Sequence, residues 1–212
     1  MMGRVPAKKT PRLGRPPSSD SADTRRRILD SARETFAKFG YGASTNRILA
    51  LRAQVTTAAL YHYFDSKLTL YCAVFDEAQD RIYARFQSSI EGIPGFLDRF
   101  EAVLEASHEL NREDPSLARF VGAARIDRTR YNEVRLATQS AGERFSFFFK
   151  LVDDAVKRGE VAKNDRAAVG VLLRTVLIGL TDAVSQSDSE HRLAVDAFRS
   201  IFEGKTLIRR ID

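Results

Sequence analysis

The sequence predicts an all-α protein, and three observations support this fold class. Apolar residues recur at helical spacing in one segment after another along the chain. No segment shows the sustained alternation of apolar and polar residues that is typical of a half-buried strand. Short breaks rich in Gly, Pro, Asn and Asp divide the chain into about nine helical segments. We therefore expect a small three-helix domain followed by a larger helical domain.

Composition argues against several classes of protein. The 212 residues are 43% apolar, which is enough for a packed core. No uninterrupted apolar run approaches the roughly 18 residues of a membrane span, and the N-terminus lacks the apolar segment of a secretion signal. The lone Cys72 leaves no intrachain disulfide, and the three histidines lack metal-ligand spacing. We expect a cytoplasmic protein without metal or cofactor, and without the glycine-rich loop or nucleophile elbow of an enzyme.

The positive charge of the chain is concentrated near its N-terminus. Residues 1–19 carry five basic and no acidic side chains, which gives a net charge of +5. Residues 20–67 carry eight basic and five acidic side chains, and residues 68–212 carry 21 basic and 23 acidic ones. The two later parts therefore have net charges of +3 and −2. A polyanionic partner such as DNA is expected to contact the first third of the chain.

Residues 1–22 are predicted to form a flexible basic arm, because they are rich in Pro, Gly, Ser and basic residues. The segment Pro11–Pro17 contains a Gly-Arg-Pro sequence that is similar to minor-groove hooks. Arg15 is therefore a candidate for insertion into a narrow minor groove. An unstructured solubilising tail is an equally good interpretation of this arm. A helix is then expected from Thr24, with Gly40 in a left-handed conformation just past its end.

Residues 44–64 have the spacing of a helix-turn-helix. A short helix is expected to begin at its N-cap Ser44, and a second one is expected to begin at Thr56. The second helix would present small methyl and hydroxyl groups to a major groove. Methyl groups contact thymine methyls, and hydroxyl groups reach base edges or phosphates. The candidate DNA contacts on this helix are Thr56, Thr57, Ala59, Tyr61 and His62.

This region also resembles the TetR family of bacterial transcriptional regulators. The resemblance spans roughly a fifth to a quarter of the chain. The residues that carry it are Thr24-Arg-Arg-Arg-Ile-Leu-Asp-Ser-Ala, Phe36, Gly40-Tyr41, Thr45, Leu49-Ala50, Ala53, Val55-Thr56, Ala59-Leu60-Tyr61-His62-Tyr63-Phe64, Ser66-Lys67 and Leu70. In that family the Leu-Tyr-x-x-Phe run closes the recognition helix. The resemblance implies phosphate contacts by Tyr61, His62 and Lys67, and it places Thr45 and Asn46 where free amides favour phosphate.

Two positions depart from the family pattern. Gln54 occupies the turn, where the family usually has glycine, and a left-handed conformation there would cost about 1 kcal/mol. Thr57 stands where the family often has lysine or arginine, so the recognition helix is nearly uncharged. Phosphate attraction is therefore expected from the arm and from basic residues around the motif. These basic residues are Arg25, Arg26, Arg27, Arg47, Arg52 and Lys67.

Residues 68–212 are predicted to form the larger domain, with helices at roughly 95–111, 115–129, 135–159, 165–186 and 190–203. In the TetR family the C-terminal helices form a ligand pocket and a dimer interface. The segment 165–186 is apolar nearly all round, so it must be buried on two sides. With the segment 190–203 it is expected to form a two-fold four-helix interface. The candidate interface residues are Leu173, Leu177, Leu180, Ala194, Phe198 and Phe202.

The candidate lining of a ligand pocket is mainly aromatic. Most of these phenylalanines could instead fill the core, and Arg125 with the nearby Asp127 could form a surface ion pair rather than orient a ligand. The candidate pocket residues are Phe96, Phe100, Phe120, Arg125, Phe145 and Phe148.

The sequence therefore predicts a helix-turn-helix DNA-binding domain at residues 23–67 and a ligand-binding and dimerisation domain at residues 68–212. The function expected is that of a ligand-responsive transcriptional regulator, a repressor. It would bind double-stranded, pseudo-palindromic operator DNA as a homodimer and respond to a small-molecule effector. The alternative is a non-specific architectural DNA-binding protein.

Overall fold

The fold is all-α, as predicted. The computed structural model describes residues 17–139, 142–183 and 187–205, and the side chains of residues 17–20, 142–146 and 183 lie outside this description. The helices are α1 (Pro17–Ala43), α2 (Asn46–Arg52), α3 (Thr57–Tyr63), α4 (Lys67–Ser89), α5 (Phe96–Glu113), α6 (Pro115–Arg130), α7 (Asn132–Ala137), α8 (Gly142–Lys157), α9 (Arg166–Ala183) and α10 (Asp188–Phe202). None of the helices in the described ranges has the length and apolar character needed to cross a membrane.

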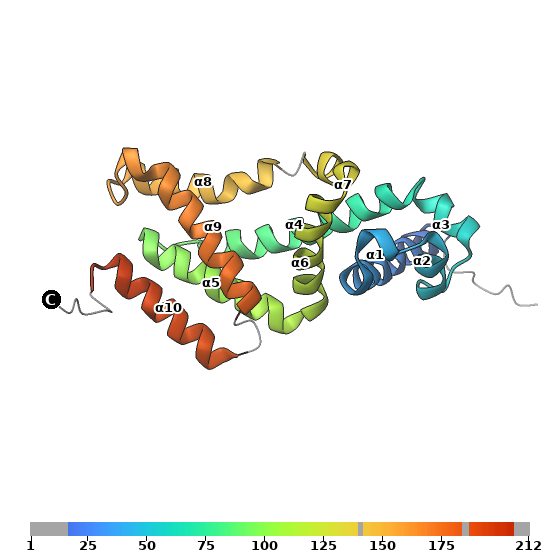
Figure 1. Cartoon of the computed structure of the whole chain (residues 1–212), viewed down its shortest axis with the longest axis horizontal. Helices are drawn as coiled ribbons and strands as arrows, with labels where there is room; N and C mark the ends of the chain where they lie inside the picture. The colour runs from blue at the N-terminus through green and yellow to red at the C-terminus, as the bar shows by residue number, and fades with distance from the viewer. Residues whose placement is uncertain (1–16, 140–141, 184–186, 206–212) are drawn as a thin grey trace, which may run out of the picture.

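The helices form two groups that α4 connects. Helices α1, α2 and α3 lie together at one end of the molecule, and α8, α9 and α10 lie toward the other end (Figure 1). Helix α4 runs from the first group into the second and packs against α1, α5, α6, α7 and α8. Helix α1 packs more extensively against α6 than against any other helix. The N-terminal group is therefore joined to the rest of the chain by both α4 and α6.

Several helix boundaries differ from those expected. Helix α1 begins at Pro17, inside the predicted arm, rather than at Thr24. The side chain of Thr45 caps α2 by accepting from the Ile48 amide, whereas the predicted cap, Ser44, donates to the Gly40 carbonyl over 2.7 Å. Gly40 has a positive φ of 72°, but its ψ of 175° is extended rather than left-handed helical.

The predicted helix 135–159 is divided into α7 and α8. The buried Thr138 terminates α7, and its hydroxyl donates to the Val134 carbonyl over 2.7 Å. A hydroxyl that bonds back to the preceding turn competes with continuation of the helix.

One hydrophobic core extends across the predicted boundary between the two domains. It contains Ile28 and Phe36 of α1, Leu60 of α3, Tyr71 of α4 and Phe120 of α6, all nearly or completely inaccessible to solvent. A second core lies among α4, α5, α8, α9 and α10. The helix-turn-helix therefore shares its core with α4 and α6, so displacements of these two helices reach it directly.

The turn between α2 and α3 contains the strained residue that the sequence suggested. Gln54 has φ of 56°, which is the left-handed region that L-residues with a Cβ avoid. The Val55 amide donates to the Ala50 carbonyl over 3.0 Å, and the Gln54 amide donates to the Leu51 carbonyl over 3.2 Å. This bonding closes the C-terminal end of α2 and sends the chain into α3.

Two stacked histidines lie where α10 packs on α5. The ring centroids of His108 and His191 are 4.0 Å apart with nearly parallel planes, and both side chains are buried. His108 Nε2 lies 2.8 Å from an oxygen of Asp188, and His191 Nε2 lies 3.6 Å from one of Glu105. Burial lowers the pKa of His191, as does the neighbouring His108, and these effects outweigh the opposing influence of Glu105 and Asp188.

Replacing Gln54 with glycine is expected to stabilise the protein. The change removes left-handed strain of about 1–2 kcal/mol and adds unfolded-state entropy that costs about 0.5–1 kcal/mol, so the net gain is roughly 0.5–1 kcal/mol. Thermal unfolding should show a rise in Tm of roughly 1–4 °C. Gln54→Ala keeps the Cβ and is the matched control, which should show no rise. A fall in the Tm of Gln54→Gly would contradict this account of the turn.

Acid is expected to destabilise the contact between α5 and α10. Because the folded-state pKa of His191 lies below its ordinary value of 6.5, the unfolded chain binds the proton first as the pH falls. The free energy of unfolding therefore decreases as the pH drops through and below that value. The difference in Tm between pH 7.5 and pH 5.5 should be smaller in His191→Gln than in the unmodified protein, whereas exposed His62→Gln should keep the full difference. Equal differences in all three proteins would contradict this role.

Candidate nucleic-acid interface and ligand pocket

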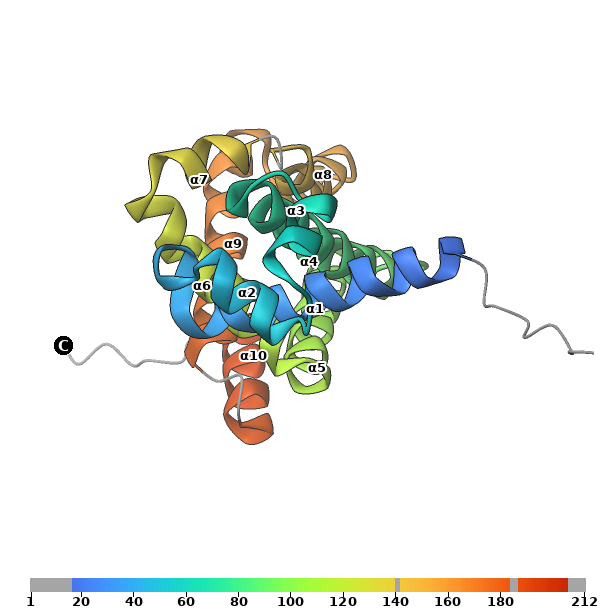
Figure 2. The same cartoon turned by 90° about the vertical axis from the view of Figure 1, so that its right-hand side faces the viewer.

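Helix α3 presents most of the predicted DNA contacts to solvent. Leu60 and Phe64 are buried and fix the helix to the core, while Thr57, Tyr61 and His62 are exposed. Figure 2 views the molecule from this end, where α2 and α3 lie in front of α4. The Thr56 hydroxyl caps α3 by accepting from the Ala59 amide over 3.0 Å, which leaves Ala59 half-buried. A surface of small hydroxyl, methyl and aromatic groups is thereby held on a rigid helix.

Helix α2 adds polar groups to the same surface. The Asn46 amide donates to the Tyr61 hydroxyl over 2.6 Å, which joins the start of α2 to the middle of α3. The Tyr61 hydroxyl keeps its own proton for an outside acceptor such as a phosphate oxygen. Thr45 and Arg47 are exposed beside this hydrogen bond. The structure therefore brings Asn46 and Tyr61 into contact, with Thr45 and Arg47 as exposed chain neighbours of Asn46.

Lys67, a predicted phosphate contact, bonds to the backbone of α1. The Lys67 ammonium donates to the Tyr41 carbonyl over 2.8 Å and lies 4.0 Å from the centroid of the Tyr41 ring. Burial lowers the pKa of Lys67 from its ordinary value. Lys67 thus holds the last turn of α1 in place, a role that the predicted phosphate contact did not include. Arg15 lies outside the described residues.

A buried carboxylate connects the helix-turn-helix to α6. Asp127 accepts from the Tyr41 amide over 3.0 Å and from the Tyr71 hydroxyl over 3.1 Å. Burial and the charge of Asp127 raise the pKa of Tyr71, so the hydroxyl stays protonated as a donor. Asp127 is thus turned toward α1 and α4, and the expected ligand-orienting or surface ion-pair role with Arg125 does not fit this position.

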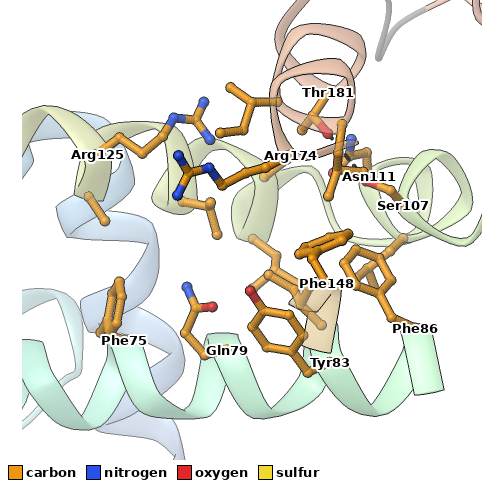
Figure 3. A pocket seen from close by; sticks show the side chains of 18 of the residues that line it. Phe75, Gln79, Tyr83, Phe86, Ser107, Asn111, Arg125, Phe148, Arg174 and Thr181 are labelled. Carbon is orange, nitrogen blue, oxygen red and sulfur yellow. Dashed lines mark hydrogen bonds between the residues drawn. The ribbon is translucent and has the colours of Figure 1, made fainter. Parts of the chain in front are cut away.

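A cavity of about 140 Å³ lies between α4, α5, α6, α8 and α9. Aromatic side chains from α4 and α8 line one side of it, among them Phe75, Tyr83, Phe86 and Phe148 (Figure 3). Burial raises the pKa of Tyr83 to about 12, against the opposing charge of Arg174. The Tyr83 hydroxyl is therefore neutral at physiological pH and able to donate a hydrogen bond.

Polar groups enter the cavity mainly from α5, α6 and α9. Arg125 and Arg174 extend over the same side of it, opposite Gln79 (Figure 3). Arg125 also forms an ion pair with Asp182 of α9, with nitrogen and oxygen 2.5 Å apart. Arg128 lines the cavity one turn further along α6, where its guanidinium lies 5.9 Å from the Phe75 ring centroid. The cavity therefore has an apolar body and a cationic side.

The predicted pocket residues divide into two sets. Arg125 and Phe148 line the cavity, whereas Phe96, Phe100 and Phe120 are buried in the two cores and do not line it. The side chain of Phe145 lies outside the described residues. Gln79 and Arg174 also line the cavity but were not among the predicted pocket residues. Both are polar positions within apolar helical stripes, and this is the signal that could have found them.

The predicted interface residues of α9 and α10 mostly face their own protomer. Leu173 is completely buried and has no surface to offer a partner, Leu177 lines the cavity, and Leu180 packs on the second core. Phe198 packs on Phe100 in a tilted arrangement, with ring centroids 5.1 Å apart. Ala194 and Phe202 are partly exposed. The outward faces of these helices instead carry the exposed apolar residues Val171, Leu172, Leu193 and Ile201.

Comparison with known proteins relates the N-terminal region to one family. The model of the family described as "Bacterial regulatory proteins, tetR family" matches residues 28–74, from α1 into α4. The HTH-type transcriptional regulator UidR of Escherichia coli K12 is 35% identical over 92 residues, 43% of this chain and 46% of UidR. The aligned segment thus spans about half the length of this relative.

Two solved structures share the fold along most of the chain. The structure of Salmonella enterica GusR has a TM-score of 0.72 at 23% identity, covering 91% of this chain and 97% of GusR. The structure of AibR in complex with isovaleryl coenzyme A and operator DNA has a TM-score of 0.68 at 17% identity, covering 84% and 97%. The segment from α1 into α4 is thus similar in sequence to the TetR family of bacterial transcriptional regulators, and the chain as a whole shares the fold of these solved structures.

Proposed function

We propose that this protein is a ligand-responsive transcriptional repressor that binds a pseudo-palindromic operator as a homodimer. The observation that carries the proposal is that one helix, α6, contributes to both candidate sites. Arg125 and Arg128 of α6 line the cavity, and Asp127 between them accepts the amide of Tyr41 next to the helix-turn-helix. A molecule in the cavity would therefore contact the helix that holds the DNA-binding group in place.

Recognition of DNA is assigned to α3 in this proposal. The exposed Thr57 would contact bases in the major groove, and Tyr61 and His62 would contact phosphates beside it. Because α3 carries no lysine or arginine, attraction to the phosphate backbone would come from exposed arginines around it, such as Arg47 and Arg52. Sequence preference would then depend on methyl and hydroxyl contacts rather than on arginine–guanine pairs.

The outward faces of α9 and α10 are the proposed dimer interface. They expose Val171, Leu172, Leu193 and Ile201, with exposed fractions of 52%, 43%, 69% and 61%. Large apolar side chains on adjoining helices are costly in water, and a two-fold contact between identical faces would bury them. The interface would thus use the opposite faces of the helices from those expected for Leu173, Leu177 and Phe198.

An effector would act by preferring one arrangement of α4 and α6 over another. Both helices line the cavity and both contact α1, so an effector that favours one arrangement alters the position of α3 relative to its two-fold mate. The AibR structure, a complex with isovaleryl coenzyme A and operator DNA, is consistent with a family member that binds both kinds of partner. The protein would act in the bacterial cytoplasm, where its operator lies.

Selection of bound fragments from random double-stranded DNA tests this proposal. The selected fragments should contain an inverted repeat, with half-sites about one helical turn or a multiple apart, because two α3 helices would enter successive major grooves. Competition should then show at least about 10³-fold tighter binding to the selected site than to random DNA.

Three results are informative. Equal binding to selected and random DNA would refute the operator and favour a non-specific architectural protein. A single half-site without a repeat would refute the homodimer on DNA. Tyr61→Phe should weaken binding to the selected site by roughly threefold to tenfold, the effect of losing one hydrogen bond to phosphate. Ser88→Ala, which removes an exposed hydroxyl at the far end of α4, should not weaken it.

A further inference from the structure

We propose that the cavity takes a small aromatic carboxylate, with the ring against the phenylalanines and the carboxylate against Arg174 and Arg125. This inference rests on the proposed function, because it specifies the chemical class of the effector. It is argued from the charge, the size and the aromatic lining of the cavity.

The charge of the cavity favours an anion. Three arginines line it, Arg125, Arg128 and Arg174, and no aspartate or glutamate is among the described lining residues. Asp182 pairs with Arg125 from the rim, but Arg174 has no carboxylate within ion-pair distance in the described part of the chain. Like charges placed beside an apolar surface repel one another, and a bound anion relieves that repulsion. A cationic or neutral ligand would leave the Arg174 guanidinium without a carboxylate partner.

The geometry suits a carboxylate rather than a spherical anion. Arginine presents parallel N–H donors that match the two oxygens of a carboxylate. Arg125 projects from α6 and Arg174 from α9, and both extend over the same side of the cavity (Figure 3). Gln79 and the neutral Tyr83 hydroxyl lie across from them. A carboxylate here would bridge α6 and α9 and compete with Asp182 for Arg125.

The volume limits the rest of the ligand to about one ring. An engineered apolar cavity of about 150 Å³ in another protein accommodates benzene, and this cavity measures about 140 Å³. Phe75, Phe86 and Phe148 offer edges and faces for an aromatic ring, an arrangement that stabilises ring pairs beyond simple burial. Phenylacetate has this size and charge, and it is the probe that follows from these constraints.

The consequence for regulation is specific to α6. The carboxylate would pull Arg125 away from Asp182, and Asp127 lies two positions further along the same helix. Displacement of Arg125 would therefore alter the position from which Asp127 holds the Tyr41 amide. The anionic group of the ligand, rather than its ring, would be the part that changes DNA binding.

Calorimetric titration of the purified full-length protein tests the ligand class. Phenylacetate should bind at least tenfold more tightly than phenylacetamide, its neutral counterpart of the same shape. Arg174→Gln should abolish this preference by weakening phenylacetate at least tenfold while changing phenylacetamide less than twofold. The matched control is Arg119→Gln, an exposed arginine on α6 that does not line the cavity, and it should behave like the unmodified protein.

Further probes distinguish a carboxylate from a phosphate as the anionic group that binds the arginines. Inorganic phosphate and phenylacetyl coenzyme A should each bind more weakly than phenylacetate. Tighter binding of the thioester would overturn the inference and assign the arginines to a coenzyme A phosphate. Equal affinities for phenylacetate and phenylacetamide, or no binding of any probe, would overturn it as well. None of these outcomes affects the selection of operator DNA, so the proposed function fails or stands separately.

Discussion

The arrangement of this molecule depends on one buried carboxylate. Asp127 is almost inaccessible to solvent, and burying a charge is costly unless hydrogen bonds compensate it. The compensation comes from the amide of Tyr41 and the hydroxyl of Tyr71, which belong to two other helices. Three helices must therefore meet at this point for the charge to be satisfied. This meeting fixes the end of α1, and with it α2 and α3, against α4 and α6.

The chain around Tyr41 is shaped for this contact. A Cβ at Gly42 would lie 2.0 Å from the Tyr131 hydroxyl, so a larger residue in this last turn of α1 would displace the Tyr131 side chain at the start of α7. Gly40 has φ of 72°, which a residue with a Cβ rarely adopts. Lys67 completes the arrangement by binding the Tyr41 carbonyl, so both polar groups of the Tyr41 backbone are bonded to side chains from other helices.

The continuous core connects the Asp127–Tyr41 contact to the cavity. Helix-turn-helix residues such as Leu60 share one apolar cluster with Tyr71 and Phe120, and α4 and α6 extend from that cluster to the cavity. Well-packed interiors transmit displacements because they have little free volume to absorb them. A change in the cavity is therefore expected to move the DNA-binding helices as a body rather than to be lost in a flexible linker.

The sequence was sufficient for the features that are determined locally. The short helices and the N-cap Thr56 follow from neighbouring residues, and the structure contains them. The sequence left two conformations open for the turn at Gln54, and the structure has the left-handed one. The cavity was not predictable in the same way. Phe100 and Phe148 look alike in the sequence, and only the packing of distant helices puts one in a core and the other at the cavity.

The outward face of α9 shows a related limit. Helix α9 is apolar nearly all round, so its sequence predicts burial on two sides without indicating which side meets its own protomer. The structure turns Leu173 inward and leaves Leu172 at the surface. Polar residues within such stripes, such as Arg174, distinguish the sides of the helix, which apolar periodicity alone does not.

The central claim is that Asp127 holds the helix-turn-helix in the arrangement that binds DNA. Hydrogen exchange at the Tyr41 amide, with and without the selected operator, tests this claim most directly. The Phe96 amide, which donates to Glu160 over 2.6 Å, is an internal reference for another amide–carboxylate bond in the same protein. Operator should slow exchange at Tyr41 at least tenfold and at Phe96 less than twofold. Unchanged exchange at Tyr41, or equal slowing at both amides, would contradict the claim.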